Sequence, residues 1–166
     1  EERIVSLSNV KSTEEFIKLE EIYKQGISPV KREDLSAAIK GRSNISNYLK
    51  EILQNASKEV IICTNAEEIG LKLKLFQQTL AELGKNNIKV KIALSGDEKL
   101  IKNIEKTLGT RIRKIDVDSK FFIVDRKEIL FYLSKNSDPD DTAIWLNSEF
   151  FAQAFATLFD RAVGGN

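Results

Sequence analysis

Apolar residues recur at helical spacing near the start of the chain. Ser12 is a plausible N-cap, Glu15 completes a capping box with it, and Gly26 closes the segment. The apolar positions follow one another at three- and four-residue intervals: Phe16, Leu19, Ile22 and Tyr23. This pattern predicts an amphipathic helix of about three turns. Two interpretations stay open, because the helix could pack on its own domain or could end a longer helix, begun before Glu1, that pairs with a second subunit.

From residue 35 onward, short apolar runs alternate with helical stripes. The runs predict strands over 35–39, 59–64 and 88–94, and the second contains Val60-Ile-Ile-Cys63, which is typical of a strand buried on both faces. Three helices are predicted between and after these strands: one capped by Ser43 or Asn44, one over 66–83 ended by Gly84, and one capped by Ser95 and ended by Gly109.

The second half of the chain is richer in strands. Alternating or apolar runs predict strands over 111–115, 121–124, 128–133 and 142–146, and the middle two are read as a hairpin. Ser148 caps a last helix, whose four aromatic residues are predicted to be core: Phe150, Phe151, Phe155 and Phe159. Together, these strands and helices predict an α/β fold over residues 35–166, with a mixed sheet flanked by helices. The amphipathic helical segment of residues 1–34 precedes it.

Composition narrows the function classes. The chain has 166 residues with a net charge of +1, which argues against a dedicated nucleic-acid surface on the whole domain. Neither a leader nor a bilayer-length apolar run occurs, and a lone Cys63 fits a reducing compartment, so we predict a cytoplasmic protein without a membrane partner. The absence of Met indicates that Glu1 is not the natural start and that a larger protein was trimmed.

Residue types that carry common chemistry are missing. Without His, no mechanism that needs imidazole as nucleophile, base or metal ligand is open to this chain, and a single Cys excludes Cys-rich zinc sites. No glycine-rich phosphate loop occurs, so we predict neither a cofactor nor a metal. Ligands of α/β sheets usually lie at the carboxyl ends of strands, where the candidate binding residues are Thr64, Asn65, Ser95, Gly96 and Lys120.

One stretch, from Asp116 to Asn136, resembles the signature of the phospholipase D superfamily. That signature is His, one residue, Lys, four residues and Asp, followed by a strand that ends in small polar residues and Asn. The matching positions here are Lys120 and Asp125, with Ser134 and Asn136 near the polar end and Asp118 at the His position. The family's enzymes use that His as the nucleophile on phosphorus. The resemblance therefore implies the fold without the activity, with Lys120 and Asp125 on neighbouring strands.

The order of elements over about 35–162 also resembles the C-terminal portion of TrmB-type transcriptional regulators, a largely archaeal group. Their layout is a winged-helix DNA-binding domain, a coiled-coil dimerisation helix and a phospholipase D-like domain that can sense an effector. The resemblance implies a non-catalytic regulatory domain, a homodimer formed in part through residues 16–23, and DNA bound through a winged helix upstream of Glu1. Two alternatives are a protein-interaction module without a small ligand and a phospholipase D-class phosphodiesterase or nuclease.

Overall fold

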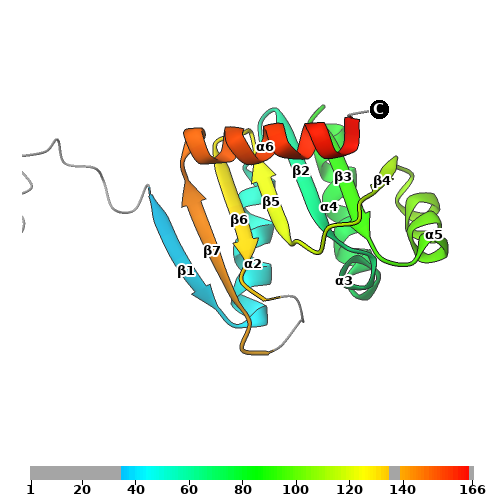
Figure 1. Ribbon diagram of the computed structural model, residues 1–166, viewed down its shortest axis with the longest axis horizontal. Coiled ribbons are helices and arrows are strands. Elements are labelled where there is room, and N and C mark those ends of the chain that lie inside the picture. Colours follow the sequence, from blue (N-terminus) through cyan, green and yellow to red (C-terminus); the bar gives the residue numbers. More distant parts are fainter. Residues whose placement is uncertain (1–34, 135–138, 165–166) are drawn as a thin grey trace, which may run out of the picture. The chain divides into compact units, whose positions relative to one another are not determined.

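A computed structural model describes residues 35–134 and 139–164, which are built around one seven-stranded sheet (Figure 1). The strand order is β1-β7-β6-β5-β2-β3-β4. The strands are β1 (Ser36–Lys40), β2 (Glu59–Asn65), β3 (Lys89–Ser95), β4 (Ile112–Lys114), β5 (Phe121–Val124), β6 (Glu128–Tyr132) and β7 (Thr142–Asn147). The pairs β2–β3 and β3–β4 are parallel and the other four are antiparallel, so the predicted mixed sheet is confirmed.

Helices cover both faces of this sheet. They are α2 (Arg42–Gln54), α3 (Ala66–Leu71), α4 (Leu73–Lys85), α5 (Glu98–Leu108) and α6 (Glu149–Gly164). The helices α2 to α5 pack on one face around Ile62 and Leu94, and α6 crosses the other face over Ile61 and Ile123 (Figure 1). Because both faces are covered, residues 60–64 of β2 are all buried, as their apolar run predicts.

Two predicted helix starts are wrong. Neither Ser43 nor Asn44 caps α2, because the N-cap is Gly41, whose φ of 97° favours glycine. The Asn44 side chain lies inside the first turn and donates to the carbonyl of Lys40. Likewise, Ser95 is the buried last residue of β3, and α5 is capped by Asp97, whose carboxylate accepts from the backbone N–H of Leu100.

The helix predicted over residues 66–83 is two helices. They meet at Lys72, whose φ of −118° and ψ of 29° leave the helical region, one residue beyond α3. Gly84 does not end the second helix, which continues to Lys85. The turn that follows uses Asn87 at φ 57°, a conformation that Asn tolerates. The predicted stop at Gly109 is confirmed, with φ 66°.

The prediction for the last helix is confirmed in part. Ser148 accepts from the backbone N–H of Phe151, so it is the expected cap. Phe159 is buried and Phe151 and Phe155 are half-buried, but Phe150 is 87% exposed and is not core. The first three follow one another at four-residue intervals along one face, whereas Phe150 points about 100° away from that row.

The predicted helix of residues 12–26, with its candidate dimerisation positions Phe16, Leu19, Ile22 and Tyr23, lies outside the described residues. Asn136 lies outside them as well. None of the described helices is long and apolar enough to cross a membrane.

Candidate functional site

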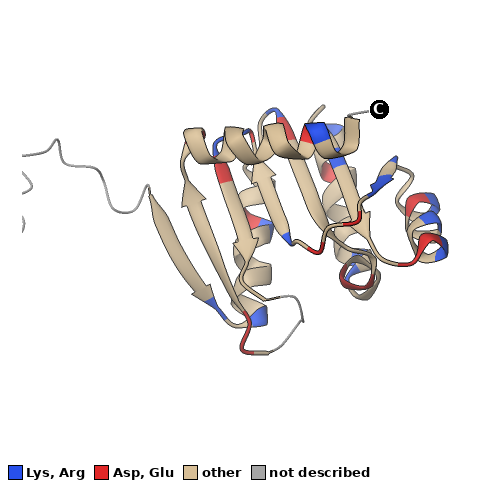
Figure 2. Ribbon diagram, in the orientation of Figure 1, with Lys and Arg blue, Asp and Glu red and all other residues tan. Residues whose placement is uncertain are grey.

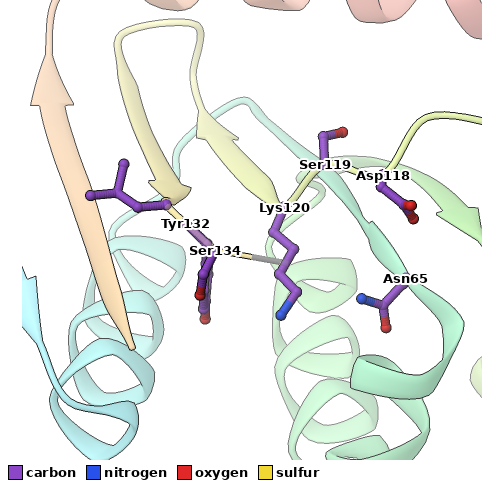
Figure 3. Close-up of a pocket in the computed structure, with 7 residues that line it drawn as sticks. Asn65, Asp118, Ser119, Lys120, Tyr132 and Ser134 are labelled. Atoms are coloured by element: carbon purple, nitrogen blue, oxygen red, sulfur yellow. The ribbon is translucent and has the colours of Figure 1, made fainter. Parts of the chain in front are cut away.

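A small polar cavity of about 140 Å³ lies at one edge of the sheet, where β2 and β6 end and β5 begins (Figure 3). It is lined by Asn65, Asp118, Ser119, Lys120, Tyr132, Leu133 and Ser134. The antiparallel pairing of β5 with β6 places Tyr132 beside Lys120. The carbonyl of Lys120 accepts a hydrogen bond from the Tyr132 N–H at 2.9 Å. Asn65 joins them because β2 runs antiparallel to β5 and ends at the same edge.

Lys120 is the buried cation of this cavity, with only 6% of its surface exposed. Its Nζ lies 3.5 Å from a carboxylate oxygen of Glu68 and 5.3 Å from the centre of the Tyr132 ring. Glu68 also pairs with Lys72 at 3.3 Å, so these three groups together carry one positive charge. A buried ammonium needs such partners, because desolvation without them is costly. The buried ammonium favours an anionic group next to Lys120, and the exposed carboxylate of Asp118, which also lines the cavity, favours a hydrogen-bond donor.

Three hydroxyl groups lie around Lys120, those of Tyr132, Ser134 and Ser119. Burial, followed by the negative charges of Glu68 and Asp141, raises the pKa of Tyr132, which therefore stays a neutral phenol. Ser134 Oγ donates to Asp141 at 2.6 Å. Ser119 Oγ lies 3.3 Å from Cys63 Sγ, and burial raises the pKa of that thiol, so Cys63 is not a reactive thiolate.

Asn65 has two roles. Its Oδ1 accepts from the backbone N–H of Glu68 at 2.8 Å and caps α3, which sets the orientation of the amide. Because the oxygen is used by the helix, the amide nitrogen is turned toward the side of the cavity where Lys120 lies (Figure 3). The cavity therefore combines an ammonium and an amide donor, both placed by the ends of strands.

Asp118 lies exposed at the rim of the cavity, two residues before Lys120. This is the position at which the phospholipase D signature has His. A carboxylate here is a hydrogen-bond acceptor and repels a phosphodiester at short range. The 166 residues contain no His at all.

Asp125 is not part of this cavity. Asp125 and Lys120 lie at opposite ends of the same strand, β5, so the expectation that they occupy neighbouring strands is wrong. The Asp125 carboxylate accepts from the backbone N–H groups of Ser57, Lys58 and Glu59 at 2.7–3.0 Å. It thereby joins the β5–β6 turn to the start of β2. The strand predicted over 121–124 already places Lys120 before it and Asp125 after it, so only the contact of Asp125 with the start of β2 needed the tertiary structure.

Of the five candidate binding residues, the structure brings Asn65 and Lys120 to the cavity and leaves out Thr64, Ser95 and Gly96. Thr64 and Ser95 are buried, and Gly96 at φ 118° approaches Ala66. The residues missed as binding candidates include Ser119 and Tyr132. The hairpin register could have indicated Tyr132, because a turn centred on Arg126 places it opposite Lys120.

We expect Thr64→Val to raise the free energy of unfolding by about 1 kcal/mol. The Thr64 hydroxyl is buried and has no hydrogen-bond partner among the described residues, and a buried unsatisfied group costs about 1–3 kcal/mol. Valine keeps the shape of the side chain and removes that cost. Urea unfolding followed by circular dichroism measures the change, and a loss of stability would contradict the prediction.

Comparison with known protein families identifies the chain. Residues 37–163 match the family described as transcriptional regulator TrmB, EBD N-terminal subdomain, where EBD denotes the effector-binding domain. The chain belongs to the TrmB family. The resemblance to TrmB-type regulators is thereby confirmed, and it now covers nearly all of the described residues. No curated protein matches the chain significantly.

Solved structures agree with the phospholipase D-like fold of this TrmB domain. The archaeal chromatin protein TrmBL2, described as showing a novel mode of DNA binding, is 18% identical with a TM-score of 0.60, over 96% of this chain and 63% of TrmBL2. Nuc from Salmonella typhimurium, a phospholipase D family member, is 14% identical with a TM-score of 0.58, over 76% of this chain and 92% of Nuc. NucT from Helicobacter pylori is 13% identical with a TM-score of 0.59, over 78% and 95%.

Proposed function

We propose that this chain is the non-catalytic regulatory domain of a DNA-binding transcriptional regulator and that it binds a small anionic effector at Lys120. The observation that carries the proposal is the cavity itself, in which a buried ammonium lies beside the Asn65 amide in a chain without His. Membership of the TrmB family supports the regulatory role.

The size and charge of the cavity indicate the class of effector. Pockets for drug-sized ligands span about 300–1,000 Å³. A cavity of about 140 Å³ fits instead a single small group, such as a phosphate or a carboxylate. Asp118 at the rim accepts hydrogen bonds, so a hydroxyl or amino group next to the anionic group is favoured. A phosphorylated or carboxylated polyol has both features.

The absence of His, the nucleophile of the phospholipase D signature, supports a sensing role over hydrolysis. The solved structures with this fold include phospholipase D family members, but the cavity here holds Asp118 where their signature has His, and no other imidazole is available. Asp118 is an exposed carboxylate, so at the position of the nucleophile it opposes attack on a phosphodiester, whereas the buried ammonium of Lys120 can still hold an anionic group.

The proposal extends to the whole regulator. Residues 1–34 are a dimerisation segment that pairs through Phe16, Leu19, Ile22 and Tyr23, and a winged helix upstream of Glu1 binds DNA in the cytoplasm. A net charge of +1 on this chain supports DNA contact elsewhere in the protein. Effector binding would change the equilibrium between arrangements of the paired subunits and thereby the affinity for DNA.

Thermal unfolding in the presence of small anions tests effector binding. With inorganic phosphate or glycerol 3-phosphate at about 100 times the dissociation constant, we expect Tm to rise by about 5–10 °C, because ligand binding at that excess stabilises by about 2.7 kcal/mol. Glycerol alone should leave Tm unchanged. Lys120→Gln should weaken phosphate binding more than tenfold, whereas Lys127→Gln, exposed at the far end of β5, should not.

Two outcomes would overturn the proposal. One is an unchanged Tm with every anionic probe, which would favour the interaction module without a small ligand. The other is hydrolysis of a generic phosphodiester above the blank, which would restore the enzyme alternative. The Lys120→Gln variant must retain the circular dichroism spectrum of the parent for its binding result to count.

A further inference from the structure

The helix α6 has a second apolar face that no described part of the chain covers. Phe150 is 87% exposed and Leu158 is 59% exposed, and a shallow groove between them runs over Ala154. We call these three residues the outer row. Apart from Glu149, Asp160 and Arg161, α6 carries no charged residue, and most of its ribbon in Figure 2 is tan. An exposed phenylalanine in such a row indicates a surface that another protein covers.

The orientation of the outer row is fixed by the opposite side of α6. Phe159 packs into the sheet against Phe121, with ring centres 6.4 Å apart. Asp160 accepts from Lys91 and from Arg126 at 2.9 and 2.7 Å. Since these contacts prevent rotation of the helix, the outer row cannot turn inward.

We propose that α6 pairs antiparallel with α6 of a second copy of this chain, with the two-fold axis beside Ala154. Phe150 and Leu158 lie four residues to either side of Ala154. A two-fold axis there places Phe150 against the leucine, and Leu158 against the phenylalanine, of the second copy. Such a self-complementary patch is what a symmetric dimer requires. Alanine at the crossing point lets the helices approach closely.

The charges of the groove fit the same arrangement. Glu149 and Arg161 line its two ends, six residues on either side of position 155. In an antiparallel pair centred near Ala154, Glu149 lies next to Arg161 of the partner subunit. The two helix dipoles also run in opposite directions, which is favourable. A second copy therefore matches the groove in both shape and charge.

The expected dimer is weak if α6 acts alone. A standard interface buries about 1,600 Å², more than one pair of 16-residue helices offers, so we expect a dissociation constant in the micromolar range. The pairing does not depend on an effector, and a failed phosphate titration would leave it intact. It also differs from pairing through residues 16–23, so its test must report on α6 directly.

Oxidative crosslinking of Ala154→Cys in the full 166-residue chain provides that report. Packed helix axes lie about 8–10 Å apart and each Cα lies about 2.3 Å from its axis, so two residues facing each other at the crossing have Cα atoms about 3.4–5.4 Å apart. A disulfide needs about 4.4–6.8 Å. We expect rapid formation of a covalent dimer. The matched control is Leu71→Cys, at another exposed apolar position, which is 80% exposed and ends α3.

Charge reversal tests the antiparallel register. In the Ala154→Cys background, Glu149→Arg or Arg161→Glu should each lower the crosslinking rate about two- to tenfold, because each change replaces two attractive pairs by repulsive ones. The double reversal should restore the rate. Circular dichroism confirms that α6 remains folded in each variant.

Two results would overturn the proposal. One is an Ala154→Cys crosslinking rate no higher than that of Leu71→Cys, which is expected if a different partner, such as another part of the effector-binding domain, covers the outer row. The other is a double reversal that is slower than either single change, which would contradict the pairing of Glu149 with Arg161 of the partner subunit.

Discussion

Phe159→Ala should lower the free energy of unfolding by about 3–4 kcal/mol. The Phe159 side chain is 3% exposed and fills the space between α6 and the sheet, where it meets the Phe121 ring edge to face. Truncation of a buried phenylalanine removes its apolar burial and leaves a cavity, at a cost of about 3–5 kcal/mol. Urea unfolding, followed by the fluorescence of Trp145 on β7, measures the loss.

The same helix provides the control. Phe150→Ala should change the free energy of unfolding by less than about 0.5 kcal/mol, because its ring is mostly in water already. The comparison is made at a protein concentration below the dimer dissociation constant, since pairing of α6 would otherwise add to the stability of the parent. Equal losses for the two variants would contradict the assignment of one aromatic residue to the core and the other to the surface.

Asp125→Asn should lower the free energy of unfolding by about 2 kcal/mol at neutral pH. Three backbone N–H groups and the Ser57 hydroxyl donate to the Asp125 carboxylate. Hydrogen bonds to a charged group contribute about 1.5–3 kcal/mol each when buried, and solvent at this half-exposed turn reduces the total. The amide of Asn has a single acceptor oxygen. Asn also tolerates the Asp125 φ of 54°, so the backbone is not strained by the change.

The loss should depend on pH in a defined direction. Burial alone would raise the pKa of the Asp125 carboxyl, but the backbone N–H groups of Glu59, Ser57 and Lys58 stabilise its charged form and hold the pKa below its usual value. A lowered pKa means that the contribution is complete above the unfolded pKa of about 3.9 and is lost as the pH falls through the folded pKa. The difference between the parent and Asp125→Asn should therefore shrink as the pH falls below about 4.

Denaturant unfolding of both proteins at several pH values measures this dependence. Asp116→Asn is the matched control, because Asp116 is exposed and lies on the loop before the cavity. It should behave as the parent at every pH. A difference between the parent and Asp125→Asn that stays constant down to pH 3 would contradict the role given to the ionised carboxylate.

The elements that could be predicted from the sequence are those set by local patterns. The run from Val60 to Cys63 and the two runs around Arg126 predict a buried strand and a hairpin, because continuous apolar residues are stable only where both faces are covered. Capping was predicted less well. Gly41 is the N-cap of α2, and its N–H donates to the carbonyl of Asp141, a hundred residues away, which no local pattern predicts.

The residues of the candidate site also differ in how far local patterns predict their positions. Asn65 could be predicted, since it ends an apolar run and sheets bind ligands at the carboxyl ends of strands. Lys120 precedes its run and reaches the same cavity because β5 is antiparallel to β2. The predicted strand over 121–124 placed Asp125 at the far end from Lys120, but its partner could not be predicted, because no local pattern says which distant segment lies beside that end. In the structure four strand residues separate it from Lys120 and direct it to a different partner, the start of β2.

From the sequence by itself we predicted that these 166 residues offer no imidazole and that residues 35–166 form an α/β fold, and both conclusions depend on residue types and local periodicity. The resemblance to TrmB-type regulators depended instead on the order of the motifs along the chain. Only the tertiary structure decided that Lys120 is buried against Glu68 and that Phe150 faces outward. Both depend on which strands pair and how α6 is rotated over them. Such contacts join distant residues, and their free energy is determined by the packing of the whole domain.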